Sequence, residues 1–235
     1  MSTRSTRSHS SGKQLLPGRH GLTRSLVVEN QRERILESVS ATCASKGYAE
    51  MTVEDIIAGA GVSRRTFYDL FDDKEQCFLD AYDQIVGRLF KEVSRAYWAG
   101  ERPWTDRIAS GLRALVEVFA DGPELARVAV VDVLAAGQPA LERRNAALRE
   151  FAAFFEPGRT VLPAEMTGHE LLAQAVVGGL HEVLYAHVAE GKTASLPGLL
   201  PDLVYCALVP YLGHAGAVDA RESARAADGG AARQR

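Results

Sequence analysis

Apolar residues recur every three or four positions along most of this 235-residue chain, the spacing that lines one face of an α-helix. Phe78, Ala81, Ile85 and Leu89 form one such stripe. No segment has the sustained period-two alternation of β-branched residues that marks a strand, and the Asn-Gly signal of a tight hairpin is absent. The pattern predicts an all-α fold.

Capping residues and helix breakers divide the pattern into nine predicted helices. Ser, Thr and Asp precede helical stretches as N-caps, while Gly and Pro stand where stretches end. The predicted helices run from about 29 to 45, 52 to 61, 63 to 70, 72 to 99, 108 to 121, 123 to 137, 139 to 157, 167 to 190 and 197 to 212.

The two ends of the chain differ in composition from its middle. Residues 1–28 contain five basic residues and no acidic one, so we expect a disordered basic arm. Residues 214–235 are mostly Ala, Arg, Gly and Asp without apolar periodicity, and we expect a disordered tail. The predicted folded domains are residues 29–75 and 76–213.

Net charge is informative only when it is divided by segment. The whole chain carries −3 with a pI near 6.1, which gives no sign of a nucleic-acid partner. By segment, however, residues 1–28 carry +5, residues 29–78 carry −4, and the remainder carries −4. The average therefore hides a basic arm ahead of an acidic domain.

Sequence features also bear on the compartment. The three cysteines, Cys43, Cys77 and Cys206, are more than thirty residues apart, unlike the ligands of a metal site or a disulfide framework. Residues 1–25 lack the apolar segment of a signal peptide, and Leu171 to Ala189 is interrupted by polar residues. We expect a soluble, cytoplasmic protein without a membrane span.

Residues 52–71 have the features of a helix-turn-helix. Two short predicted helices meet at Gly61, where a residue without Cβ allows a sharp turn, and Ser63 caps the second helix. Phe67 and Phe71 lie four residues apart and are expected to pack inward. The residues left facing outward are Arg64, Arg65 and Tyr68. Arginine can pair with guanine in the major groove, and a hydroxyl suits a phosphate oxygen.

The run from Thr52 to Glu75 resembles the headpiece of the tetracycline-repressor (TetR) family. The resemblance is carried by Ala-Gly-Val-Ser at the turn, Thr-Phe-Tyr on the second helix, the Phe71 anchor and Lys74 at the start of the next helix. Ile57 and the Cys77-Phe78 pair depart from the usual pattern in ways that look like core variation. The resemblance implies DNA contacts by Thr52, Arg64, Arg65, Thr66, Tyr68 and Lys74.

The basic arm has two interpretations. Because the headpiece is acidic, the +5 arm is a candidate source of electrostatic attraction to phosphate, with Arg19 and Arg24 among its contacts. The arm is equally well read as an extension without a role.

In the resembled family, the helices after the headpiece form a ligand cavity, and the last two long helices pair with a second subunit. The candidate ligand contacts are Phe90, Trp104, Phe119, Phe155, His181 and Tyr185, with Tyr97, Trp98 and Phe151 as further aromatic candidates; ordinary core packing is the alternative. Gly178 and Gly179 within a helix indicate close packing against a neighbour. Leu199, Leu203, Cys206 and Val209 form an apolar stripe for the dimer interface or for the chain's own core.

These features together predict a homodimeric regulator that binds double-stranded DNA at a near-palindromic operator and responds to a small-molecule ligand, most simply as a repressor. The alternatives are a ligand-responsive activator and a helical dimeric scaffold without DNA binding. An enzyme is not expected, because the chain has no Gly-rich phosphate loop, nucleophile elbow or clustered acid pair. His181-Glu182 lacks the second histidine of a zinc motif, since Tyr185 occupies that position, and we predict no catalytic residue, cofactor or metal.

Overall fold

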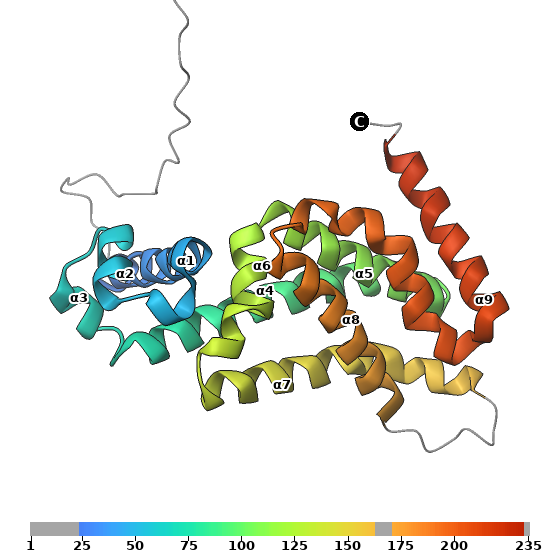
Figure 1. Cartoon of the computed structure of the whole chain (residues 1–235), viewed down its shortest axis with the longest axis horizontal. Coiled ribbons are helices and arrows are strands. Elements are labelled where there is room, and N and C mark those ends of the chain that lie inside the picture. Colours follow the sequence, from blue (N-terminus) through green and yellow to red (C-terminus); the bar gives the residue numbers. More distant parts are fainter. Residues whose placement is uncertain (1–23, 163–170, 233–235) are drawn as a thin grey trace, which may run out of the picture.

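The computed structural model describes residues 24–162 and 171–232, which contain nine α-helices and no strand (Figure 1). The prediction of an all-α fold is confirmed. The helices are α1 (Arg24–Glu50), α2 (Val53–Ala60), α3 (Arg64–Tyr68), α4 (Lys74–Tyr97), α5 (Trp104–Asp121), α6 (Pro123–Val130), α7 (Gln138–Ala152), α8 (Leu171–Ala189) and α9 (Leu200–Ala232). Short 3-10 helices cover Asp132–Ala135, Ala153–Val161 and Thr193–Leu199.

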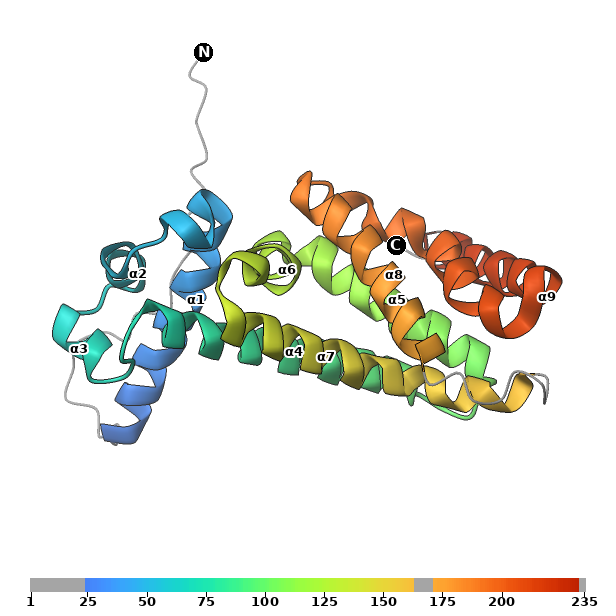
Figure 2. The same cartoon turned by 60° about the horizontal axis from the view of Figure 1, so that its bottom comes forward.

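Helices α1 to α3 form a headpiece at one end of the molecule, and α5 to α9 form a larger core (Figures 1 and 2). The 24-residue α4 begins in the headpiece and continues through the core beneath α5 and beside α7. Its N-cap is Asp73, whose carboxylate accepts a hydrogen bond from the Gln76 backbone N–H at 2.8 Å, one residue later than the sequence pattern placed it. One continuous helix therefore joins the two parts of the molecule.

The first helix is longer than predicted. It begins at Arg24, so residues 24–28 are helical and do not belong to a disordered arm. Residues 1–23, which hold the rest of that predicted arm, lie outside the described residues. At the other end, Gly47 has a φ of 78° and interrupts the helix where the sequence predicted its stop.

The prediction of a disordered C-terminal tail from residue 214 is wrong, because α9 continues to Ala232 after a kink at Gly213, where φ is 68°. Ala217 and Ala224 are buried, and Arg221 forms a 2.6 Å ion pair with Asp202 in the first half of the helix. Alanine is the best helix former, so an Ala-rich segment needs few large apolar residues to stay helical. Figure 1 shows this segment at the edge of the core.

Helices α8 and α9 are more apolar than a surface helix needs to be. Helix α8 and the helical segment Thr193–Ala227, which runs from the preceding 3-10 helix into α9, each contain an 18-residue stretch apolar enough to cross a bilayer, with mean hydropathies of 1.2 and 1.3. Their own fold explains much of this composition, because α8 contributes buried residues from Ala173 to Val188 and α9 buries Leu200, Val204 and Leu208. Core helices commonly have such a composition, so it is weak support for a membrane span.

Candidate nucleic-acid interface and ligand cavity

The turn between α2 and α3 has helix-turn-helix geometry. Gly61 adopts a left-handed conformation (φ 62°, ψ 40°), and its N–H donates to the α2 carbonyls. Ser63 then caps α3, its hydroxyl oxygen accepting the Thr66 backbone N–H at 3.0 Å. The two predicted short helices, the turn at Gly61 and the cap at Ser63 are all confirmed.

Helix α2 rests closely on α1. The Ser38 hydroxyl of α1 donates to the Ile56 carbonyl at 2.9 Å, and a Cβ added at Gly59 would lie 2.3 Å from that hydroxyl oxygen. The Arg34 guanidinium donates to the Ala60 and Gly61 carbonyls and so stabilises the C-terminal end of α2. Gly59 and Arg34 were not singled out from the sequence, because their role depends on contact with a helix some twenty residues away.

The outward face of α3 carries the expected side chains. Phe67 and Phe71 are buried, with ring centroids 5.6 Å apart, as their spacing predicted. On the opposite side, the side chains of Arg64 and Arg65 are 66% and 90% exposed, and Tyr68 is 46% exposed. Two cations and a phenol therefore share one accessible face.

Both arginines already have acidic partners in this structure. Arg64 lies 2.5 Å from Glu54 of α2, with its guanidinium over the Tyr68 ring, and Arg65 lies 3.8 Å from Asp69 one turn on. Exposed pairs of this kind are worth only about 0–1 kcal/mol, so a phosphate or a base can replace the carboxylates. Neither carboxylate was predicted as a partner from the sequence, although the four-residue spacing of Arg65 and Asp69 was a usable signal.

The two candidate threonines are engaged in helix caps. Thr52 and Asp55 form a capping box, in which the Thr52 N–H and hydroxyl both donate to Asp55 Oδ2, at 3.0 and 2.7 Å. Hydrogen bonds from Lys46 and Thr52 lower the pKa of Asp55 to about 2. The Thr66 hydroxyl lies 2.8 Å from that of Ser63. A DNA contact by either threonine stays a prediction, and that of Thr52 would compete with Asp55.

Lys74 has a different environment from the one expected. Its ammonium donates to the carbonyls of Tyr48 and Met51, at 3.2 and 3.0 Å, and lies 4.4 Å from the centroid of the Tyr48 ring. These contacts attach the first turn of α4 to the kinked end of α1 and to Met51 just after it. A phosphate contact by Lys74 therefore has to be made with the remaining N–H of a side chain held inside the headpiece.

Of the two arginines predicted to contact DNA from the arm, the structure describes only Arg24. Arg24 is the first residue of α1 and is exposed, whereas Arg19 lies outside the described residues. Their DNA contacts remain predictions.

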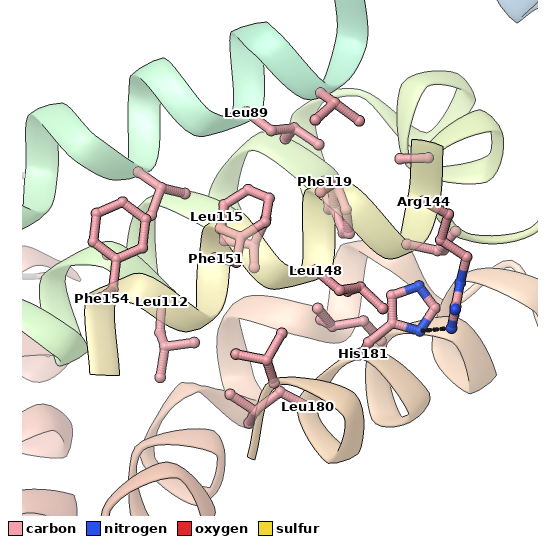
Figure 3. A pocket seen from close by; sticks show the side chains of 18 of the residues that line it. Leu89, Leu112, Leu115, Phe119, Arg144, Leu148, Phe151, Phe154, Leu180 and His181 are labelled. Carbon is pink, nitrogen blue, oxygen red and sulfur yellow. Dashed lines mark hydrogen bonds between the residues drawn. The ribbon is translucent and has the colours of Figure 1, made fainter. Parts of the chain in front are cut away.

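A cavity of about 110 Å³ lies in the core between α4, α5, α7 and α8, with α6 closing part of its wall (Figure 3). Of the predicted ligand contacts, Phe119, Phe155 and His181 line it, as do Tyr97 and Phe151 among the further aromatic candidates. The rest of the lining is almost wholly aliphatic and aromatic. Such a pocket is suited to an apolar ligand body.

The other candidates do not line the cavity. Phe90 packs behind the wall against Phe151 and Phe154, with centroid distances of 5.6 and 5.5 Å. Trp104 donates its indole N–H to the Phe154 carbonyl at 3.0 Å and closes over Gly158. Tyr185 and Trp98 are also absent from the lining. Helical spacing predicted which helices surround the cavity, but it did not predict which aromatic side chains of those helices point into it.

The polar part of the cavity wall consists of Arg144 and His181, which Figure 3 shows at one end of the group of lining residues. The Arg144 Nη2 lies 3.3 Å from the His181 Nδ1. His181 is 8% exposed, and burial together with the Arg144 charge lowers its pKa to about 4, so the imidazole is neutral at pH 7. Arg144 was not anticipated, because the two residues lie 37 positions apart and no local pattern connects them.

Helix α6 touches both the cavity and the headpiece. Its Ala129 and Val130 line the cavity, while its Arg127 donates Nε to the Cys43 carbonyl of α1 at 3.2 Å. Just beyond α6, the buried Asp132 accepts the Tyr48 N–H at 3.1 Å and lies 3.4 Å from Arg127. Burial raises the pKa of Asp132 despite these contacts. The kinked end of α1 is therefore fixed to a segment whose other face borders the cavity.

Comparison with known proteins agrees with this geometry. Residues 35–81 match the family model for bacterial regulatory proteins, tetR family. The chain is 28% identical over 99 residues to EthR, an HTH-type transcriptional regulator of Mycolicibacterium smegmatis, a match that covers 42% of this chain and 46% of that protein. It is 29% identical over 175 residues to an uncharacterized HTH-type transcriptional regulator of Mycobacterium bovis, covering 67% of this chain and 79% of that one. The chain thus spans less than half of the EthR length.

Solved structures share the fold. The fatty acid degradation regulator FadR from Bacillus halodurans superimposes with a TM-score of 0.67 at 18% identity, covering 76% of this chain and 94% of that one. FadR from Bacillus subtilis, solved in complex with stearoyl-CoA, gives a TM-score of 0.65 at 17% identity, covering 77% and 98%. The helix-turn-helix geometry, the matched segment and the shared fold agree: residues 35–81 form a DNA-binding segment of the tetR type, within a chain whose fold is that of TetR-like regulators.

Proposed function

We propose that the chain is a homodimeric repressor that binds a near-palindromic DNA operator and is released when a small-molecule ligand with an apolar body occupies the core cavity. The observation that carries this proposal is the cavity, because its walls include parts of α4 and α6, the two helices that also contact the headpiece. A ligand that changes the cavity can thus change where the two headpieces lie. Such coupling need be only about 1–3 kcal/mol.

The face of α3 supplies the DNA contacts in this proposal. Arg64 and Arg65 are the base and phosphate contacts, with Tyr68 donating to a phosphate, and each exchanges a weak intramolecular interaction for a DNA contact. Thr52, Thr66 and Lys74 are retained as secondary phosphate contacts. With only five residues in α3, few side chains can reach the bases, so specificity is concentrated in these positions.

The apolar surface of α8 and α9 supports a dimer. Gly178 and Gly179 are exposed, and a Cβ added at either would meet nothing within 4 Å in the single chain. Val183 on the same helix and Cys206 on α9 are exposed as well, whereas Leu203 is buried in the chain's own core and leaves the predicted interface stripe. A second copy packed here would bury this surface and place two recognition helices about 34 Å apart. Its apolar composition then needs no membrane, in keeping with a cytoplasmic protein.

Response to ligand travels through α6 in this scheme. A ligand that displaces Ala129 and Val130 also moves Arg127 and Asp132, which hold the Cys43 carbonyl and the Tyr48 N–H of α1. The stearoyl-CoA of the FadR neighbour supports an apolar, acyl-type ligand body.

Selection of bound sequences from random DNA by the full chain tests the DNA-binding half of the proposal. We expect an enriched palindrome, and loss of its binding in the double variant Arg64→Ala, Tyr68→Ala. Arg95→Ala is the matched control, because Arg95 is another exposed arginine, on α4, that pairs with Glu92 away from the headpiece. Binding that survives the double substitution at physiological salt would place the recognition surface elsewhere.

The role proposed for the arm rests on its charge. Deleting residues 1–23 leaves the described part of α1 complete and removes four basic residues. If the arm binds phosphates, the slope of log K against log salt becomes shallower by about 0.9 for each phosphate that the shortened chain no longer neutralises. An unchanged slope would mean that the arm has no part in binding.

A further inference from the structure

Two buried hydrogen-bond donors belong to residues at one end of the ligand cavity, and neither has an acceptor in the described part of the chain. Arginine can only donate, so the contact from Arg144 Nη2 makes His181 Nδ1 the acceptor and leaves the imidazole proton on Nε2. Among the described residues, neither His181 Nε2 nor Arg144 Nε has a hydrogen-bond partner, although both atoms are buried. Buried donors are nearly always satisfied, so this pair calls for an oxygen atom that the described residues do not supply.

The same end of the cavity carries an uncompensated positive charge. The described part of the chain places no carboxylate within ion-pair distance of Arg144, whose other recorded side-chain contact is the amide oxygen of its neighbour Asn145 at 2.9 Å. The adjacent Arg143, by contrast, pairs with Asp83. A half-buried guanidinium beside a neutral imidazole favours an anion over a neutral oxygen.

The rest of the cavity sets the size and polarity of the ligand body. Leu112, Leu115, Phe151 and Phe154 are among the apolar residues that line it away from the polar end (Figure 3). A cavity needs about 10–15 Å³ per water molecule, so 110 Å³ holds roughly ten small heavy atoms. That matches a medium-length chain with one polar end.

We propose that the inducing ligand is a medium-chain carboxylate, whose carboxylate oxygens accept hydrogen bonds from Arg144 and His181 while its alkyl chain fills the apolar cavity. This inference rests on the proposed ligand-responsive function and adds the chemical class of the ligand. It assigns Arg144 and His181 to head-group recognition and distinguishes a free acid from an acyl thioester, whose large head group would have to remain outside the cavity.

Isothermal titration of the full chain with octanoate, octan-1-ol and octanoyl-CoA tests the assignment. We expect octanoate to bind roughly ten- to hundred-fold more tightly than octan-1-ol, the range that hydrogen bonds to a charged group provide. Arg144→Met should abolish this preference while retaining octan-1-ol binding, which shows that the cavity is intact. Arg149→Met, an exposed arginine on the same helix, is the matched control and should keep the preference.

Equal affinity for octanoate and octan-1-ol, tighter binding of octanoyl-CoA, or an unchanged preference in Arg144→Met would overturn the proposal. If Arg144→Met also loses octan-1-ol, the octanoate to octan-1-ol ratio of His181→Leu decides by the same criterion. Operator binding is measured in parallel without ligand. A chain that binds its operator but shows no preference for octanoate refutes only the ligand assignment, whereas failure to bind any operator refutes the proposed function.

Discussion

Because His181 is buried, we expect the free energy of unfolding of the chain to depend on pH. The pKa of His181 is about 4 in the folded chain, against an ordinary value of 6.5, because burial and the Arg144 charge both disfavour the imidazolium. Between these two values the unfolded chain binds a proton that the folded chain does not. Lowering the pH through this window therefore lowers the free energy of unfolding. Above about pH 6.5 the imidazole is neutral in both states, and this loss of stability is absent.

The size of the effect follows from the two pKa values. Each pH unit between them changes the free energy of unfolding by about 1.4 kcal/mol, so lowering the pH from 7 to 5 should remove about 2 kcal/mol. With a urea m-value of about 2 kcal/mol/M, the unfolding midpoint falls by about 1 M. The variant His181→Gln has no imidazole to titrate, and its midpoint should fall by correspondingly less over the same interval.

Urea unfolding followed by circular dichroism at pH 7, 6 and 5, at one protein concentration, measures the difference. The informative quantity is the pH-dependent loss in the wild type minus that in His181→Gln, because other titrating groups cancel. His187→Gln is the matched control on the same helix, since His187 is only half-buried and lies outside the cavity lining. The reasoning is refuted if the wild type and His181→Gln lose the same stability between pH 7 and pH 5.

Three further predictions concern the headpiece and the dimer. Glu54→Gln removes the acidic partner of the recognition arginine, so operator affinity measured by fluorescence anisotropy should rise two- to fivefold, roughly, while the remote control Glu92→Gln should not change it. Gly59→Ala should lower the free energy of unfolding by about 1–2 kcal/mol, because its Cβ would overlap a side chain of α1, whereas Gly87→Ala on an open face of α4 should raise it by about 0.5–1 kcal/mol. Gly179→Leu should leave the single chain folded but shift it from dimer to monomer in sedimentation velocity.

Each of these predictions has a clear contrary outcome. Unchanged or weaker operator binding by Glu54→Gln would mean that the carboxylate does not compete with DNA. Equal effects of alanine at Gly59 and Gly87 would contradict the close packing of α2 on α1. A Gly179→Leu variant that sediments as a dimer would place the interface on another surface.

The headpiece was predictable because its determinants are local. The left-handed turn at Gly61, the caps at Thr52 and Ser63 and the inward face of Phe67 and Phe71 each depend on residues within a few positions of one another. Their conformations can therefore be predicted from spacing and residue type alone.

The features that were not predicted have two causes. Some depend on contacts between residues distant in sequence, and one depends on the alanine-rich composition of its segment. The pairing of Arg144 with His181, and the packing that turns Phe90 away from the cavity, depend on how separate helices are rotated against each other. Spacing fixes the face of one helix but not the neighbour that this face meets. The C-terminal helix was missed for a different reason, because alanine stabilises a helix without producing an apolar stripe.

The position of Trp104 gives the chain an optical reporter of its own ligand. The chain has two tryptophans, and Trp104 packs with Phe155 of the cavity lining, at a centroid distance of 6.5 Å, whereas Trp98 is 63% exposed. A ligand that displaces Phe155 alters the surroundings of the Trp104 indole, whose emission is sensitive to its environment. In Trp98→Phe, the remaining tryptophan fluorescence comes from this single ring when tryptophan is excited selectively, so cavity occupancy can be titrated without attaching a dye.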